Sequence, residues 1–183
     1  MQLITDERIL QVLRGFNPWW ATGKVPDSLT RPVKRFAYYE ALQSFEHATI
    51  RRHVILSGPR RVGKSTIMYQ TIEHLLSANI PARNILYVSF DHPMLKMSEM
   101  DHILRVFVNN IAADEHICLF LDEIQYAKDW DAWLKTIYDH SPAYRIMATG
   151  SASPMLNEKM TESGVGRWVQ VRIPTLSFYE YLE

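Results

Sequence analysis

A short glycine-containing stretch, preceded by an apolar strand and followed by a helix, constrains this chain more than any other feature. Its residues are Gly58, Pro59, Arg60, Arg61, Val62, Gly63, Lys64, Ser65 and Thr66. The pattern G-x-x-x-x-G-K-[ST] between a strand and a helix is that of a phosphate-binding loop. Its glycines let the backbone curl around a polyphosphate, so that N–H groups at the helix N-terminus face the anion. The stretch therefore predicts a polyphosphate site, and its flanks argue against a chance glycine-rich turn.

Different side chains of this loop are expected to have different roles. Lys64 has the length to reach the outer phosphates, and the hydroxyl of Ser65 is placed to bind Mg²⁺. Arg60 and Arg61 occupy positions whose side chains face outward in such loops. We therefore expect them to make surface or partner contacts rather than to hold phosphate.

The composition is that of one soluble domain of 183 residues. Lys plus Arg is 20 and Asp plus Glu is 20, so the formal net charge is zero. This balance argues against strong nonspecific binding to nucleic acid, but a local basic patch is still possible. No apolar run approaches the ~18 residues of a membrane helix, and charges interrupt the N-terminus where a signal peptide is apolar. We expect a cytoplasmic protein without a membrane partner. The single cysteine, Cys118, excludes an internal disulfide and lies in an apolar run that predicts a core position.

Continuous apolar runs alternate with helical segments along the chain, as in a parallel sheet covered on both faces. The runs expected to form strands are 54–56, 85–90, 116–121, 144–149 and 168–173. Such alternation implies right-handed crossovers between parallel strands. The sequence therefore predicts an α/β fold with a five-stranded parallel sheet.

Three further segments carry helix or turn signals. Helical spacing of Phe36, Tyr39, Leu42 and Phe45 predicts a helix at 35–47, before the first sheet strand. Ser98-x-x-Asp101 resembles a capping box and predicts a helix start. Asn17-Pro18-Trp19-Trp20 carries turn chemistry, and its tryptophans form either a plug on the core or a wall against a base. We favour the plug, because large aromatic side chains usually act through buried area.

A pair of carboxylates ends the strand predicted at 116–121. Asp122 at the carboxyl end of that strand, beside the phosphate loop, is expected to hold Mg²⁺ through water. Glu123 points differently and is expected to orient and deprotonate an attacking water. The alternative is an acidic pair that caps the following helix. Two adjacent acids with divided roles favour hydrolysis over nucleotide binding alone.

Two more positions are candidates for contact with the outer phosphate. Thr149 or Ser151, at the end of the strand predicted at 144–149, is placed between metal and phosphate, and helix capping is the equally weighted alternative for Ser151. Arg167 follows Gly164-Val165-Gly166, and there it would act as an arginine finger on the nucleotide of a neighbouring subunit or be a solvated loop residue. The first role for Arg167 requires a homo-oligomer.

These motifs together resemble the AAA+ group of P-loop ATPases, in particular bacterial and archaeal ATPases with a further domain after the nucleotide-binding core. The resemblance rests on the phosphate loop, Asn17 to Trp20, Leu121 to Gln125 with Trp130, Thr149 to Ser151 and Gly166-Arg167. It implies a three-layer α/β/α sandwich with sheet order 5-1-4-3-2, ATP with Mg²⁺ at the carboxyl ends, and Glu123 as the catalytic acid. It divides the chain into an N-terminal helical segment, 1–50, and an ATPase core, 51–183, with a lid or second domain expected after Glu183.

The leading hypothesis is an ATP-hydrolysing switch, and three others remain. One is a nucleotide-gated interaction module that binds ATP and rarely hydrolyses it. Another is a nucleic-acid-associated ATPase, for which the basic residues are Arg31, Lys34, Arg35, Arg51, Arg52, Arg60 and Arg61. A small-molecule kinase is the weakest, because no arginine-rich lid or acceptor pocket is visible.

Overall fold

The computed structural model describes residues 4–47, 49–151, 166–176 and 180, with the side chain of Ser151 left out. The elements in chain order are α1 (Asp6–Phe16), α2 (Trp19–Thr22), α3 (Phe36–Phe45), β1 (His53–Gly58), α4 (Lys64–Ser77), the 3₁₀ turn η1 (Ala82–Asn84), β2 (Ile85–Ser89), α5 (Pro93–Met97), α6 (Met100–Asn110), β3 (Cys118–Asp122), the 3₁₀ turn η2 (Ile124–Tyr126), α7 (Trp130–His140), β4 (Arg145–Ser151) and β5 (Trp168–Arg172). Every strand predicted from an apolar run is present, with its ends moved by a few residues. The sequence Ser177-x-x-Glu180 also has the capping-box pattern and predicts a helix start, but it begins outside the described residues.

The strands form one parallel sheet whose neighbours follow the order β2-β3-β4-β1-β5. From the β5 edge the same order is 5-1-4-3-2. Gly58 pairs with Ser151 and Ser89 pairs with Asp122, so the carboxyl ends of these strands lie together at one end of the sheet. In open α/β sheets this is the end where ligands bind.

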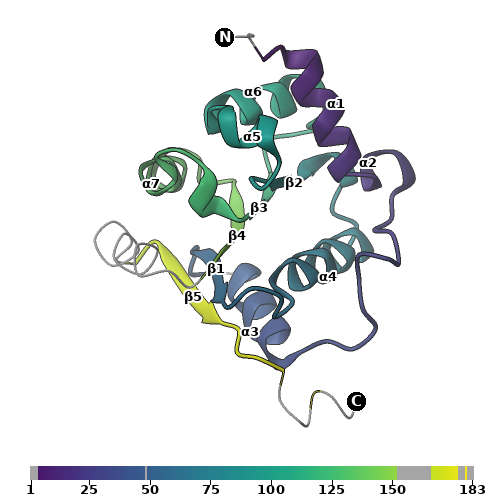
Figure 1. Cartoon of the computed structure of the whole chain (residues 1–183), viewed down its shortest axis with the longest axis vertical. Coiled ribbons are helices and arrows are strands. Elements are labelled where there is room, and N and C mark those ends of the chain that lie inside the picture. The colour runs from purple at the N-terminus through teal and green to yellow at the C-terminus, as the bar shows by residue number, and fades with distance from the viewer. Residues whose placement is uncertain (1–3, 48, 152–165, 177–179, 181–183) are drawn as a thin grey trace.

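Helices cover both faces of the sheet and make a three-layer α/β/α arrangement (Figure 1). One face carries α3 and α4, and its buried side chains come from alternate strand positions that include Val54, Tyr87 and Phe120. The other face carries α1, α5, α6 and α7, and includes Ile55 and Leu119. Because neighbouring strand residues point to opposite faces, a strand covered on both sides must be apolar throughout, and this explains the continuous runs.

The paired tryptophans pack on the core, as predicted. Trp19 is fully buried beside α4, and Trp20 stacks on Phe107 of α6 with 5.5 Å between ring centroids. Both indole N–H groups donate to the carbonyl oxygen of Ile85, at 3.1 and 2.8 Å. The segment therefore wraps the free edge of β2, where an uncovered strand would invite pairing with another chain.

The helix predicted at 35–47 is present as α3, whereas the capping box predicted at Ser98 is wrong. In α3 the residues against the sheet are Ala37, Tyr38, Ala41 and Phe45, whereas Phe36 and Tyr39 are 74% and 57% exposed. The buried face of α3 therefore combines two alanines with the large side chains of Tyr38 and Phe45. Ser98 does not cap α6, because its hydroxyl donates to the carbonyl oxygen of Met94 and thereby ends α5.

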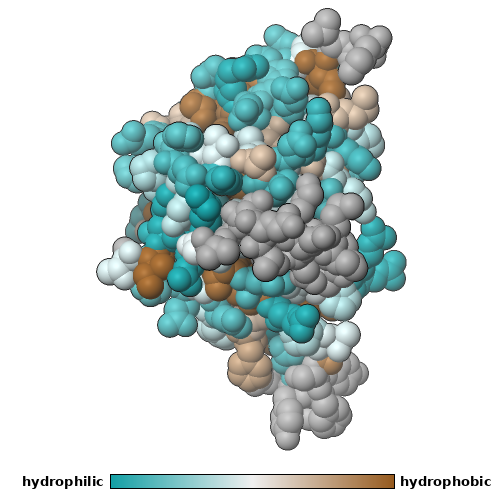
Figure 2. All heavy atoms as spheres, turned by 90° about the vertical axis from the view of Figure 1, so that its left-hand side faces the viewer, coloured by the Kyte–Doolittle hydropathy of each residue, from teal (hydrophilic) through white to brown (hydrophobic). Residues whose placement is uncertain are grey.

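The surface visible in Figure 2, on the side that carries α7, is mainly hydrophilic over the described residues. Its hydrophobic side chains stand in small separate groups, as on the surface of most folded proteins. Within the described part of the chain, no helix combines the length and the apolar character needed to cross a membrane.

Candidate nucleotide-binding site

The phosphate loop joins the carboxyl end of β1 to the first turn of α4, as its motif predicts. Its two glycines are required for different reasons. Gly63 has φ +91°, a left-handed conformation that side chains disfavour. Gly58 instead lies under the chain that follows β5, where an added Cβ would come within 2.3 Å of the carbonyl oxygen of Ile173. The loop is therefore held by backbone shape on one side and by close packing on the other.

Lys64 lies folded over this loop. Its ammonium donates to the carbonyl oxygens of Gly58 at 3.0 Å and Pro59 at 2.8 Å, and the residue is only 5% exposed. A positive charge thus lies at the N-terminus of α4, where the helix dipole also favours an anion. The arrangement suits a polyphosphate, whose oxygens would share the ammonium with the two carbonyls.

Asp122 is the centre of a network of hydroxyl groups. Its Oδ2 accepts hydrogen bonds from Ser65 at 2.8 Å and from Tyr87 at 2.7 Å, and its Oδ1 accepts one from Thr149. The residue ends β3 and is 5% exposed. A carboxylate in this position links the loop, the two neighbouring strands and β3 itself.

Glu123 leaves the strand in a left-handed conformation, with φ +53°. Its backbone N–H donates to Thr149 Oγ1 at 2.9 Å, and its carboxylate accepts a hydrogen bond from the side chain of Gln125. Asp122 is buried against the loop, and Glu123 is half-buried beside it.

Tyr87 was not predicted as part of the site. Burial and the neighbouring Asp122 carboxylate raise the pKa of Tyr87, so its hydroxyl remains protonated and donates. Its ring packs on Tyr69 of α4 at 4.8 Å between centroids, and burial also raises the pKa of Tyr69. A tyrosine inside an apolar run is expected to be a core residue. Only the parallel register, in which Ser89 lies opposite Asp122, brings the hydroxyl of Tyr87 to the carboxylate of Asp122.

A cavity of about 440 Å³ opens beside the loop and the first turns of α4. The residues that line it are Arg31, Pro32, Val33, Arg35, Arg61, Val62, Gly63, Thr66, Ile67, Gln70, Leu176 and Glu180. The side-chain amide of Gln70 donates to the carbonyl oxygens of Arg31 and Val33, at 2.7 and 3.0 Å, and so holds the chain before α3 over this cavity. The combination of an apolar wall with polar groups is typical of a small-molecule site.

A sequence model of the AAA domain family matches residues 50–182. The chain belongs to this AAA domain family. It is 33% identical over 156 residues to an uncharacterized protein of Methanocaldococcus jannaschii. The aligned region covers 81% of this chain and 32% of that relative. It is 29% identical over 153 residues to an uncharacterized protein of Haemophilus influenzae, covering 82% of this chain and 37% of that one. The chain thus spans about a third of the length of these relatives.

The Orc1 protein of Aeropyrum pernix, whose structure was solved in complex with DNA, has a similar fold. The two structures superpose with a TM-score of 0.55 and 13% identity, over 87% of this chain and 49% of that one. At this identity the likeness concerns the fold alone. Family and fold together make this an AAA-type, P-loop α/β domain.

Other residues predicted to act in this AAA domain lie as follows. Ser151 ends β4 opposite Gly58, at the correct end of the sheet. Arg167 precedes β5 at the opposite end, where it forms an ion pair with Asp139 of α7 at 3.1 Å. Since β1 has six residues and a strand rises about 3.3 Å per residue, Arg167 stands roughly 20 Å from the loop of its own chain. It cannot serve that loop in cis.

The basic residues suggested for nucleic acid do not share one surface. Arg51 and Arg52 precede β1, whereas Arg60 and Arg61 follow it at the other end. Arg35 is used internally, since its guanidinium donates to Val62 O at 2.7 Å and forms an ion pair with Glu180 at 2.9 Å. Arg60 and Arg61 are exposed, as expected, and Arg60 donates to the hydroxyl of Tyr126 at 2.8 Å.

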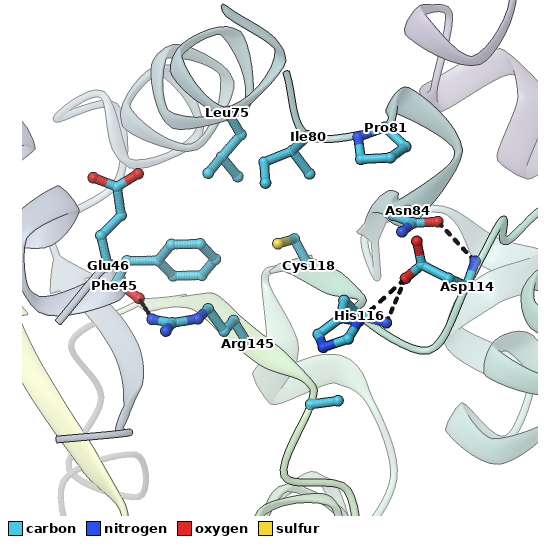
Figure 3. Close-up of a pocket in the computed structure, with 11 residues that line it drawn as sticks. Phe45, Glu46, Leu75, Ile80, Pro81, Asn84, Asp114, His116, Cys118 and Arg145 are labelled. Atoms are coloured by element: carbon cyan, nitrogen blue, oxygen red, sulfur yellow. Dashed lines mark hydrogen bonds and ion pairs between the residues drawn. The ribbon is translucent and has the colours of Figure 1, made fainter. Parts of the chain in front are cut away.

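A further cavity, of about 430 Å³, lies at the amino ends of β3 and β4 (Figure 3). Phe45, Leu75, Ile80 and Cys118 form its apolar side, and Arg145 donates to the carbonyl oxygen of Phe45. Cys118 is buried, as predicted, and this burial raises the pKa of its thiol to about 11, so the thiol stays protonated at neutral pH. Because this cavity is at the wrong end of the strands, it is separate from the loop.

Proposed function

We propose that this AAA domain binds ATP with Mg²⁺ and hydrolyses it, and that hydrolysis drives a conformational switch. The observation that carries the proposal is the 2.8 Å hydrogen bond from Ser65 Oγ to Asp122 Oδ2. It joins the loop that would hold the phosphates to the acid that would hold the metal. Family membership and fold support the nucleotide-binding part of the proposal.

The residues present fit Mg²⁺. This ion prefers hard oxygen ligands and keeps several waters, and Ser65 and Asp122 supply a hydroxyl and a carboxylate at one point. Asp122 is 5% exposed, and the side chains that contact it supply hydroxyl oxygens, which are the hard donors that this ion prefers. When bound, Mg²⁺ would supply neutralisation of the phosphate charge.

Each site residue then has a role. The loop from Gly58 to Thr66 surrounds the phosphates with backbone N–H groups, and Lys64 contacts the outer ones. Glu123 orients the attacking water and accepts its proton. Ser151 or Thr149 responds to the presence of the outer phosphate, and the contacts of Thr149 with both acids favour a role for it in holding them.

The cavity beside Gln70 is where we place the adenine. It adjoins Gly63 and Thr66, so a nucleoside there lies next to phosphates held by the loop. One wall comes from Arg31 to Val33, before α3, and the core of 51–183 would thus share its nucleotide with the helical segment 1–50. This shared cavity supports treating the two segments as one working unit.

Arg167 is proposed to act on the nucleotide of a neighbouring subunit, which makes the working form a homo-oligomer. Its distance from the loop of its own chain excludes a role in cis, and its ion pair with Asp139 holds it at the surface. An arginine supplied in trans contributes roughly 10³–10⁵ in rate in related phosphoryl-transfer systems.

The test separates binding from hydrolysis. Glu123→Gln should bind Mg·ATP with wild-type affinity and lose turnover by about 10²–10⁴-fold, because only the proton acceptor is removed. ATP binding is measured by titration calorimetry and turnover by phosphate release, with Glu115→Gln, at an exposed site before β3, as the matched control. Unchanged turnover in Glu123→Gln would refute its role. Tight binding without turnover in the wild type would instead support the nucleotide-gated module.

A further inference from the structure

The segment from Asn17 to Trp20 does more than cover the edge of β2. The side chain of Asn17 donates to the carbonyl oxygen of Tyr87 at 2.8 Å and accepts the N–H of the same residue at 2.6 Å. It therefore satisfies both backbone groups that Tyr87 directs away from the sheet. Asn17 is 1% exposed, and a third bond, to the carbonyl oxygen of Leu13 at 2.7 Å, fixes its amide to α1.

Tyr87 carries this restraint to Asp122. In the register of β2 and β3 it lies opposite Phe120, and its own backbone N–H and C=O are both bonded to Asn17. Its ring is held on α4 by Tyr69 and is 3% exposed, and its hydroxyl reaches Oδ2 of Asp122 at 2.7 Å. Hydrogen bonds and buried side chains thus join Asn17 to the carboxylate of Asp122.

We propose that Tyr87 is a positioning residue for the metal-binding carboxylate of Asp122, and that Asn17 holds Tyr87 in place. This inference rests on the proposed binding of Mg·ATP. A carboxylate offers about four lone-pair directions, and the hydroxyls of Tyr87, Ser65 and Thr149 take three of them. The carboxylate cannot rotate without breaking at least one of these bonds, so it meets the cation in one orientation.

The alternative is a buried tyrosine whose hydroxyl merely finds an acceptor. The two differ in what Tyr87→Phe changes, because this substitution keeps the ring against Tyr69 and removes only the oxygen. Loss of a partner that orients a metal ligand usually costs about 10–100-fold in metal affinity. A purely structural hydroxyl would alter thermal stability and leave the metal dependence unchanged.

The experiment measures Mn²⁺ binding by electron paramagnetic resonance in the presence of ATP, together with ATP binding in EDTA, on the whole chain. Tyr87→Phe should weaken Mn²⁺ binding by about 10–100-fold while metal-free ATP affinity stays within about twofold of wild type. Tyr38→Phe is the matched control, since Tyr38 is a 2%-exposed tyrosine in the same core cluster, on α3. Equal Mn²⁺ affinities of Tyr87→Phe and Tyr38→Phe would overturn the positioning role of Tyr87 but not the proposed function. Absence of Mn²⁺ and ATP binding in the wild type would overturn the proposed function as well.

Asn17 is tested by a double-mutant cycle. Asn17→Ala should weaken Mn²⁺ binding in the wild-type background and have little further effect in Tyr87→Phe, because it acts through that residue. Trp20→Phe is its control, since it removes a bond to Ile85 on the same strand edge and none to Tyr87. Additive effects of Asn17→Ala and Tyr87→Phe would contradict a shared path.

Discussion

Gly58→Ala should destabilise the domain and weaken nucleotide binding, even though the backbone of Gly58 suits any residue. An added Cβ would lie 2.3 Å from the carbonyl oxygen of Ile173 and 3.3 Å from a methyl of Val62. The nearer atom belongs to the backbone and cannot rotate away. The chain after β5 must therefore shift, and with it the 2.7 Å hydrogen bond from the N–H of Ile173 to the carbonyl oxygen of Ser57.

The magnitude follows from these two contacts. Overpacking a tight site costs about 1–3 kcal/mol, and a backbone hydrogen bond contributes about 1 kcal/mol net, so the expected loss is about 2–4 kcal/mol. For a chain of 183 residues this lowers Tm by roughly 4–16 °C. Differential scanning calorimetry gives the shift, and a titration with Mg·ATP gives the effect on binding.

Gly15→Ala is the matched control. Nothing lies within 4 Å of a Cβ at Gly15, which is in the last turn of α1, so alanine there should leave stability equal or raise it by up to about 1 kcal/mol. A Tm for Gly58→Ala within a degree or so of wild type, beside an unchanged Mg·ATP affinity, would refute the close-packing argument.

Lys64→Ala should abolish ATP binding in calorimetry while the protein stays folded, because the loop loses the ammonium at its centre; retained affinity would contradict the site. Burial, followed by the charge of Arg51, lowers the pKa of His53 to about 4 from its ordinary 6.5, so the unfolded chain binds the proton more readily. Stability should thus be full above pH 6.5 and fall by about 3 kcal/mol as pH drops to 4, and His53→Gln should flatten that slope in urea titrations. Arg167→Ala should lower turnover without lowering Tm, and mixing it with Glu123→Gln should restore activity if Arg167 acts in trans. Wild-type turnover in Arg167→Ala would contradict a role in hydrolysis, and the surface ion pair with Asp139 would then be the one role that the structure supports for Arg167.

The strands and the loop could be predicted because their signals are local. Both faces of the sheet are covered, so each strand is a continuous apolar run, and the phosphate loop contains its own glycines, lysine and hydroxyl. The buried face of α3 could not be predicted in this way. Phe36 and Tyr39 have helical spacing but are exposed, because α3 turns a different face, with Ala37 and Ala41, toward the sheet.

The hydroxyl network around Asp122 depends on the register of the neighbouring strands, and for this reason most of it could not be predicted from the sequence. Ser65 and Asp122 belong to motifs, but Tyr87 gains its role only from lying one strand away on the same face. Asn17 is still further away in sequence, 70 residues before Tyr87. Nothing in a turn-forming Asn-Pro pair indicates that its amide will pair with an edge strand.

The left-handed turn at Glu123 connects these observations with catalysis. Strand alternation would send Glu123 to the face opposite Asp122, away from the loop. A conformation at φ +53° costs a residue with a side chain roughly 1 kcal/mol, but strain alone does not mark function, since the exposed Asp129 has φ +50°. What distinguishes Glu123 is that its N–H is fixed by Thr149, which also holds Asp122. One hydroxyl thus contacts both acids, through the carboxylate of Asp122 and the backbone N–H of Glu123, at the end of the sheet where the phosphate loop lies.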